Sequence, residues 1–332
     1  MYELLGISLV LAALLTINAF ASLAAAAGWR LLKGPARKFS AQTRANVLFA
    51  MRVSPAVLAL TSVTAFLIPS FLTYEPYSTT EVVSKKLGAL ALLSAVGVAF
   101  AFWRGVRSWW ATRTLLREWL AIAEPVQLAL IDIPTFRIPH SFPITAVVGA
   151  VTPRLFIAES VLLTLSQEEL SAAIAHECGH LAARDNLKRS LLRACRDALM
   201  IVPCGRSLDR AWAETAECAA DEHAAQKSPA IALDLASALV KIAKMIPVGA
   251  HAAIPVAAFL VGNEEPRGVK ARVGRLLEIA TTGERVAASM PARILSVSLL
   301  SLIFVSGVLA ASNSQVLATV HSLIEHAVRV LS

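Results

Sequence analysis

The stretch that decides the fold class is residues 172–186, AAIAHECGHLAARDN. His176 and His180 lie four residues apart, so a helix would place both imidazoles on one side, one turn from each other. Glu177 follows the first histidine and would point to the adjacent side. Two imidazoles can bind one metal ion there, and a neighbouring carboxylate can deprotonate a water at that ion. Because the pattern is short, the alternative is a pair of core or solvated histidines on an ordinary alanine-rich helix.

The residues before the motif predict where its helix begins. Ser166 and Glu169 have the spacing of a capping box, and Leu165 can pack on Leu170 as a hydrophobic staple. These two local signals predict a helix that begins at about Gln167 and contains both histidines.

A second helix, predicted over 208–226 and ended by the Ser228-Pro229 pair, carries the sequence AETAECAADEHAA. A catalytic metal needs a third protein ligand while one position stays open for water. Glu217 and Asp221 are four residues apart, so one carboxylate can bind the metal while the other orients a ligating histidine. We predict Glu217 as the third ligand and Asp221 as the supporting carboxylate, with Glu214 as the competing ligand.

The composition indicates a membrane protein. Of the 332 residues, 56% are hydrophobic, and the mean hydropathy is +0.63, whereas soluble domains usually have about 45–50% apolar residues. A helix that crosses a bilayer needs about 20 predominantly apolar residues. Four such spans are predicted, at 4–27, 53–72, 87–103 and 293–312.

The distribution of basic residues predicts the orientation of these spans. The segment between the first two spans contains no acidic residue and six basic ones: Arg30, Lys33, Arg37, Lys38, Arg44 and Arg52. By the positive-inside rule this loop is cytoplasmic, so both termini are extracytoplasmic and the metal motif faces the cytoplasm. Residues 104–293 contain 22 basic and 19 acidic side chains, which is too balanced for a nucleic-acid-binding surface.

These observations divide the chain into four regions. We predict three spans with a basic cytoplasmic loop in 1–104, a cytoplasmic domain in 105–292, a fourth span in 293–312 and a short extracytoplasmic tail in 313–332. Two stretches rich in β-branched residues, 124–134 and 144–159, predict a small sheet before the motif helix. The expected fold class is therefore a mainly α membrane protein with an α+β domain between its third and fourth transmembrane helices.

The motifs together resemble a known family. AHECGH at 175–180, ECAAD at 217–221 and the upstream PITAVVGAVTPRLFIAESVLLTLSQEELSAAI are similar to the gluzincin membrane zinc metallopeptidases. The resemblance is greatest to the antibiotic-sensor transducers of the BlaR/MecR type, with the HtpX and CAAX prenyl endopeptidases as cousins. It covers about residues 120–280. Those transducers carry a large extracytoplasmic sensor domain after the last span, whereas here only about twenty residues follow it.

The resemblance implies the roles of particular residues. It implies one Zn²⁺ per chain with His176, His180 and Glu217 as ligands, Glu177 as the catalytic base, and Asp221 beside the ligands. It also implies that an extended substrate binds along the strand formed by Ala146, Val147, Val148, Gly149 and Ala150.

We therefore expect an endopeptidase that cleaves protein substrates at the cytoplasmic face of the lipid bilayer. A transcriptional repressor is the substrate that the resemblance suggests. The alternatives are a quality-control endopeptidase of the HtpX type and a non-catalytic, zinc-binding membrane scaffold or receptor. A purely structural zinc site usually has four protein ligands and needs no base, so the presence of Glu177 favours the enzyme.

Overall fold

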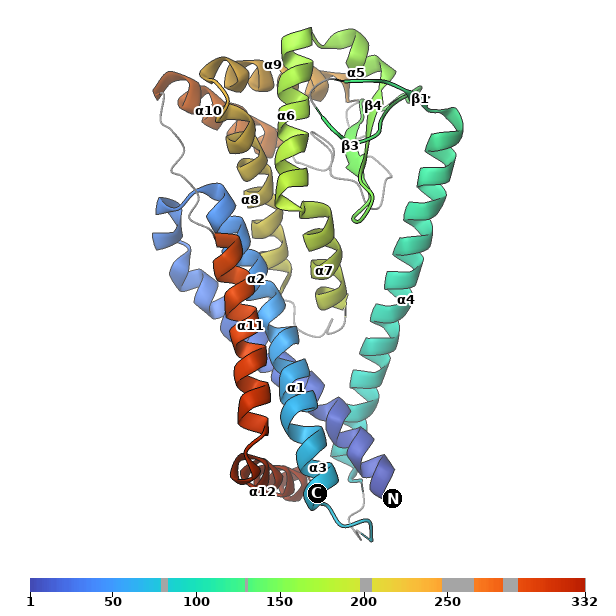
Figure 1. The fold of residues 1–332 in the computed structure, drawn as a ribbon, viewed down its shortest axis with the longest axis vertical. Coiled ribbons are helices and arrows are strands. Elements are labelled where there is room, and N and C mark those ends of the chain that lie inside the picture. Colours follow the sequence, from blue (N-terminus) through green and yellow to red (C-terminus); the bar gives the residue numbers. More distant parts are fainter. Residues whose placement is uncertain (79–82, 129–130, 198–204, 247–265, 283–291, 332) are drawn as a thin grey trace.

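A computed structural model describes residues 1–331, apart from 79–82, 129–130, 198–204, 247–265 and 283–291. The described chain is mostly helical (Figure 1). Its helices are α1 (Tyr2–Leu32), η1 (Pro35–Lys38), α2 (Ala41–Thr61), η2 (Ser62–Leu67), α3 (Ile68–Tyr74), α4 (Lys85–Ile122), α5 (Glu159–Thr164), α6 (Gln167–Ala183), α7 (Asp185–Asp197), α8 (Gly205–Ala225), α9 (Pro229–Met245), α10 (Pro266–Thr282), α11 (Ala292–Ala311) and α12 (Ser314–Leu331).

Three helices of the described chain are long and apolar enough to cross a membrane: Tyr2–Leu32, the continuous Ala41–Tyr74 and Lys85–Ile122. Each contains one predicted span and extends beyond it. The predicted basic loop is therefore short, because α1 continues to Leu32 and α2 already begins at Ala41. The fourth predicted span coincides with α11, and its crossing of the membrane remains a prediction.

The first half of α2 connects the long apolar helices to the rest of the molecule. Arg52 is buried and donates from Nε to Asp209 Oδ1 of α8 at 2.9 Å. Lys188 Nζ of α7 donates to Asn46 Oδ1 at 2.7 Å. One of the basic residues predicted to lie in a loop, Arg52, is thus part of a helix and connects it to α8.

The predicted C-terminal tail forms a helix, α12, that runs across the end of the bundle near the N-terminus (Figure 1). Ser70 Oγ donates to the carbonyl of Leu317 at 2.9 Å, and the Tyr74 hydroxyl donates to that of Ser314 at 3.0 Å. Val328 is buried in an apolar cluster that α1, α3 and α4 also form. The tail is therefore a packed element of the bundle.

The predicted small sheet has four short strands, in the order β1-β2-β4-β3. They are β1 (Glu124–Pro125), β2 (Thr135–Ile138), β3 (Thr145–Val148) and β4 (Arg154–Ala158). β2 pairs with β4 in parallel, and β3 pairs with β4 antiparallel, with Ala146 opposite Phe156. Among the described residues of the stretch 124–134, only Glu124 and Pro125 are strand, and the next strand, β2, begins just after it at Thr135.

The strand predicted over 146–150 ends earlier than expected. β3 stops at Val148, and Gly149 has a φ of +106°, which a residue with a side chain rarely adopts. A Cβ at this position would lie 2.5 Å from the carbonyl oxygen of Thr152. Gly149 and Ala150 therefore form the turn towards β4, and only the residues from Ala146 to Val148 belong to the strand.

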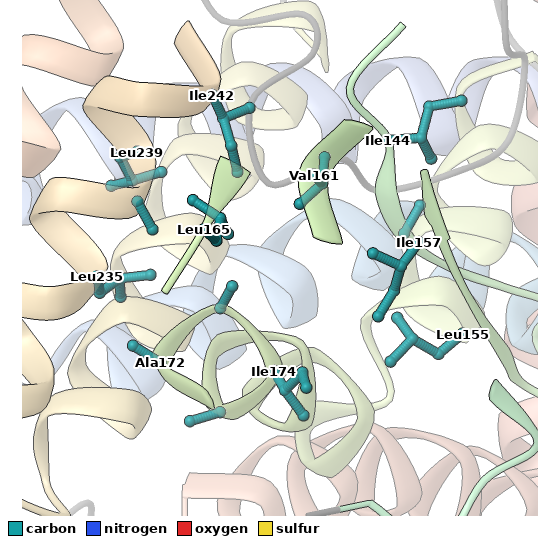
Figure 2. Packing of buried hydrophobic residues seen from close by; sticks show 14 of the residues in the cluster. Ile144, Leu155, Ile157, Val161, Leu165, Ala172, Ile174, Leu235, Leu239 and Ile242 are labelled. Atoms are coloured by element: carbon teal, nitrogen blue, oxygen red, sulfur yellow. The ribbon is translucent and has the colours of Figure 1, made fainter. Parts of the chain in front are cut away.

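The core of this half lies between the sheet, α6 and α9. Figure 2 shows Ile174 of α6 directed towards Leu155 and Ile157 of β4, while the apolar side chains of α9 face Leu165 and Val161. The capping box at the start of α6 is confirmed, since Ser166 Oγ accepts from the Glu169 N–H and Glu169 accepts from the Ser166 N–H.

Candidate metal centre

Three side chains on two helices direct their ligand atoms towards one point. His176 and His180 lie one turn apart on α6, with their Nε2 atoms 3.2 Å from each other. Glu217 comes from α8, and its Oε2 lies 3.5 Å from the first of these nitrogens and 3.6 Å from the second. All three residues are buried, and their ligand atoms lie within 4.8 Å of one another. Glu214, the competing candidate, is exposed on α8.

The donor set fits a divalent metal ion such as Zn²⁺. Two imidazole nitrogens and one carboxylate oxygen match the ligands of catalytic zinc sites that leave a fourth position open. Glu217 Oε2 is buried and has no hydrogen-bond partner among the described residues. A buried acceptor without a partner is costly, and a cation at the point where the three atoms converge would satisfy it.

Two carboxylates hold the other nitrogens of the histidines. Asp221 Oδ1 lies 2.9 Å from His176 Nδ1, and Asp185 Oδ2 lies 2.8 Å from His180 Nδ1. An Nδ1 proton directed at a carboxylate leaves Nε2 free to bind a metal, and the contact fixes the orientation of the ring. The structure thus places the predicted Asp221 beside one histidine and adds Asp185 beside the other.

Arg272 of α10 contacts two carboxylates of the site. It donates from Nε to Asp221 Oδ2 at 2.8 Å and from Nη2 to Oδ1 at 2.7 Å, and its Nη1 lies 3.4 Å from Glu217 Oε2. Burial alone would raise the pKa of Asp221, but Arg272 and His176 lower it to about 2. The pKa of Glu217 is also well below its ordinary value, because His180, His176 and Arg272 outweigh its burial. Both carboxylates are therefore ionised near neutral pH.

Glu177 is fully buried, and both of its carboxylate oxygens lack a hydrogen-bond partner among the described residues. Burial raises the pKa of this carboxyl above its ordinary value, while His180, His176 and the backbone of Val147 act in the opposite direction. A carboxyl with a raised pKa accepts a proton more readily than an exposed glutamate does. Glu177 thus lies beside the histidines, and no side chain among the described residues forms a hydrogen bond with it.

A glycine allows the two helices to approach each other. A Cβ added at Gly179 would lie 2.9 Å from Ala220 Cα and 3.2 Å from His223 Cβ. This close contact between α6 and α8 lies one residue before His180 and three after Glu217. The absence of a side chain at Gly179 therefore helps to bring the carboxylate within reach of the histidines.

The predicted substrate strand borders the site. β3 is an edge strand of the described sheet, and Asn186 Nδ2 donates to the carbonyls of Val147 at 2.9 Å and Gly149 at 3.1 Å. These carbonyls therefore point away from β4. Asn186 follows Asp185 at the start of α7, so one short segment contacts both a ligand histidine and the edge of the sheet.

The roles of three of these residues were not predicted from the sequence. Arg272 lies 51 positions from Asp221, so no local spacing could reveal the pair. Asp185 follows Arg184, whose φ of +54° ends α6 and turns the chain back towards His180, and a carboxylate just after the motif was an available signal. Gly179 lies within the motif itself, at a position that the motif does not specify.

Comparison with known proteins identifies one related family. Residues 143–246 match the model of peptidase family M48. The matched region runs from β3 to α9 and includes both histidines of α6 and Glu217. This match supports the M48 metallopeptidase family and does not single out the sensor transducers. No curated protein and no solved structure matches the chain.

Proposed function

We propose that the chain is a membrane-anchored zinc endopeptidase with one Zn²⁺ held by His176, His180 and Glu217. The observation that carries this proposal is the convergence of the three buried ligand atoms beside Glu177, whose carboxylate has no partner among the described residues. A structural zinc site would need no such base. The match of residues 143–246 to a peptidase family supports the same function.

Each of these side chains has a distinct task in peptide hydrolysis. When bound, Zn²⁺ supplies a Lewis acid that polarises the scissile carbonyl and acidifies water. Glu177 takes a proton from the attacking water and passes it to the nitrogen of the leaving amine. Asp185 and Asp221 keep the ligand histidines in the tautomer and orientation that the metal requires.

We place an extended peptide along the edge strand β3, where its main chain would replace Asn186 at the carbonyl of Val147. We assign substrate alignment to β3, whose residues Ala146, Val147 and Val148 lie beside the base and pair on one side with β4. Main-chain hydrogen bonds to a strand edge bind substrates largely independently of their side chains. An enzyme of this kind cleaves proteins that present an unfolded segment.

The basic residues of the α1–α2 connection support a cytoplasmic location for the site. Protein substrates would then reach it from the cytoplasm or from the membrane surface. Cleavage of a transcriptional repressor and removal of damaged membrane proteins both fit this arrangement, and identification of the cleaved protein in cells distinguishes them.

The test compares the full-length protein with two variants in detergent. Wild type binds one zinc per chain and cleaves an unfolded protein substrate. Glu177→Gln keeps the zinc and loses at least about a hundredfold in activity, because the base is removed and the ligands are not. His176→Ala loses both zinc and activity. Activity of Glu177→Gln equal to that of wild type would overturn the proposed mechanism, and equal zinc in His176→Ala would overturn the ligand assignment.

A further inference from the structure

The outer edge of β3 carries main-chain groups that the sheet does not use. β3 is an edge strand of the described sheet and pairs with β4. The Ala158 N–H of β4 donates to the carbonyl of Ile144 at 2.7 Å, and the direction of these groups alternates along a strand. Val147, three residues on, therefore directs its carbonyl away from β4. An extended peptide must reach this carbonyl to add a strand to the sheet.

The side chain of Asn186 occupies this edge. Its Nδ2 donates to the carbonyl of Val147 at 2.9 Å and to that of Gly149 at 3.1 Å. The amide has one possible orientation here, because turning it over would direct Oδ1 at two carbonyl oxygens. Val147 is 1% exposed, so the strand is also closed to solvent at this position. The donors of Asn186 therefore stand where the N–H groups of a bound peptide would lie.

The main chain next to Asn186 is anchored to the candidate metal centre. Arg184, with its φ of +54°, ends α6 and turns the chain. Asp185 then places Oδ2 2.8 Å from His180 Nδ1. A displacement of the whole start of α7 would disturb this contact to a metal ligand, whereas a change of rotamer at Asn186 would not. Opening the edge therefore requires the rotation of one side chain.

The other atom of the same amide makes the closed edge only slightly stable. Asn186 Oδ1 is buried and has no hydrogen-bond partner among the described residues. An unpaired buried acceptor costs about as much free energy as one or two hydrogen bonds contribute, so it offsets much of what Nδ2 gains. A peptide N–H can replace Nδ2 at the carbonyl of Val147, and the rotated amide can then find a donor for Oδ1. Displacement of Asn186 by a peptide is therefore nearly balanced in free energy.

We propose that Asn186 is a positioning residue that closes the substrate-binding edge of β3 with its side-chain amide and is displaced when an extended peptide binds. The inference rests on the proposed peptidase function, because it concerns substrate access to the same site. The backbone of Val147 also lies beside the carboxyl of Glu177, so Asn186 covers the strand position nearest to the base. The resting enzyme then admits unfolded segments that supply main-chain N–H groups in place of the amide.

The test measures kcat and KM of zinc-loaded, full-length protein in detergent, with reduced and carboxymethylated α-lactalbumin as an unfolded substrate. Asn186→Ala removes the amide, and Asn186→Asp keeps the size of the side chain but has no N–H to donate. We expect KM to fall about threefold to tenfold in both variants, with kcat within about twofold of wild type, because no closed state competes with the substrate. Ser190→Ala is the matched control and keeps both values. Ser190 is exposed on α7, and its hydroxyl donates to the carbonyl of Asn186 at 2.9 Å.

The outcomes distinguish this proposal from its premise. A merely structural role of Asn186 would not lower KM, so an unchanged KM in both variants overturns the proposal. A raised KM also overturns it, because Asn186 would then bind the substrate itself. If wild type cleaves nothing, the peptidase function fails. Binding of the same substrate, labelled with fluorescein, to wild type and Asn186→Ala then still tests the closed edge. Tighter binding by Asn186→Ala supports the proposal, and equal or weaker binding, or no binding to either protein, contradicts it.

Discussion

Gly179 is the residue on which the distance between the two ligand-bearing helices depends most directly. In Gly179→Ala the new methyl group would meet the backbone of Ala220 at 2.9 Å, and backbone cannot move aside as a flexible side chain can. We expect α6 and α8 to separate, the protein to lose about 1–3 kcal/mol of stability, and its zinc content to fall. Metal analysis and thermal unfolding of the purified variant measure both effects.

Gly274→Ala is the control for this substitution. Gly274 lies inside α10, and a Cβ there meets nothing within 4 Å. Alanine is favoured over glycine in a helix by about 1 kcal/mol, so this variant should keep its zinc and unfold at an equal or higher temperature. Zinc content in Gly179→Ala equal to that of Gly274→Ala would show that the close contact does not position the ligands.

The protonation of His180 predicts how zinc binding depends on pH. Burial alone would lower the pKa of this histidine, but Glu217 and Asp185 raise it to about 10 in the metal-free protein. Zinc requires the unprotonated imidazole, so binding below pH 10 must release a proton. We expect the apparent zinc affinity to rise about tenfold for each pH unit between 7 and 9, measured by competition with a chelator of known proton affinity.

Zinc binding by Asp185→Asn, compared with wild type, tests the contribution of Asp185. Without the carboxylate, the pKa of His180 falls, although the larger effect of Glu217 remains. The zinc affinity itself decreases by about tenfold to a hundredfold at high pH, because the ring loses its orienting partner. An affinity that does not change with pH in wild type, or an equal zinc affinity of both proteins at high pH, would contradict the role of Asp185.

The motif residues could be predicted because their geometry follows from one helix. His176, Glu177 and His180 need only the helical repeat, and Glu217 and Asp221 need only the same repeat on a second helix. Whether those two helices meet depends on contacts distant in sequence, such as the one between Gly179 and Ala220. The periodicity of each helix contains no information about these contacts.

The start of α6 is fixed by more than its local cap. Glu169 accepts from the Ser166 N–H, from Ser237 Oγ at 2.6 Å and from Lys241 Nζ at 2.7 Å, so it also joins α6 to α9. Burial alone would raise the pKa of this carboxyl, but these donors lower it. Its contribution to stability is therefore complete above the ordinary glutamate pKa of about 4.3, and it is lost as the pH falls through the lower folded-state value.

In Glu169→Gln the side chain can still accept from the cap, but the charge that faces Lys241 is gone. We expect a loss of about 1 kcal/mol at pH 7, seen as a lower unfolding temperature, and a difference from wild type that narrows below pH 4. Glu168→Gln is the control, since Glu168 is exposed and its side chain accepts from Ser166 Oγ at 2.9 Å within the same helix start. Equal destabilisation by both substitutions would argue against the link to α9.

Other elements show where the sequence reasoning fell short. The sequence predicts a short tail over 313–332, where the structure has α12, although Leu317, Val320, Ile324 and Val328 recur at helical spacing and Asn313 is a residue type that favours helix starts. That signal was available. The length of α4 could not be predicted from the sequence, because the helix continues from an apolar into an arginine- and tryptophan-rich sequence without a local break. A membrane boundary inside a helix leaves the backbone unchanged.

The long apolar helices and the metal-binding half form one structure through α2. The N–H of Ala41, at the start of α2, donates to Glu222 Oε2 at 2.9 Å, and Glu222 follows Asp221 on α8. Arg52 binds the same helix eight residues before Glu217. Because α2 contacts α8 on both sides of its metal ligand, the metal centre is held at a fixed position relative to the candidate spans.

This connection means that the orientation of the spans decides which side of the membrane the site faces. Tyr77, in the α3–α4 connection, is 82% exposed, and Val151, in the turn between β3 and β4, is 88% exposed. The basic α1–α2 connection predicts that Tyr77 is extracytoplasmic and Val151 cytoplasmic.

A membrane-impermeant maleimide should therefore label Tyr77→Cys in intact cells. Val151→Cys should gain label over the parent protein only after permeabilisation. The parent, with its native cysteines, gives the background in both conditions. Labelling of Val151→Cys but not Tyr77→Cys in intact cells would invert the orientation and place the metal centre, with its substrates, outside the cytoplasm.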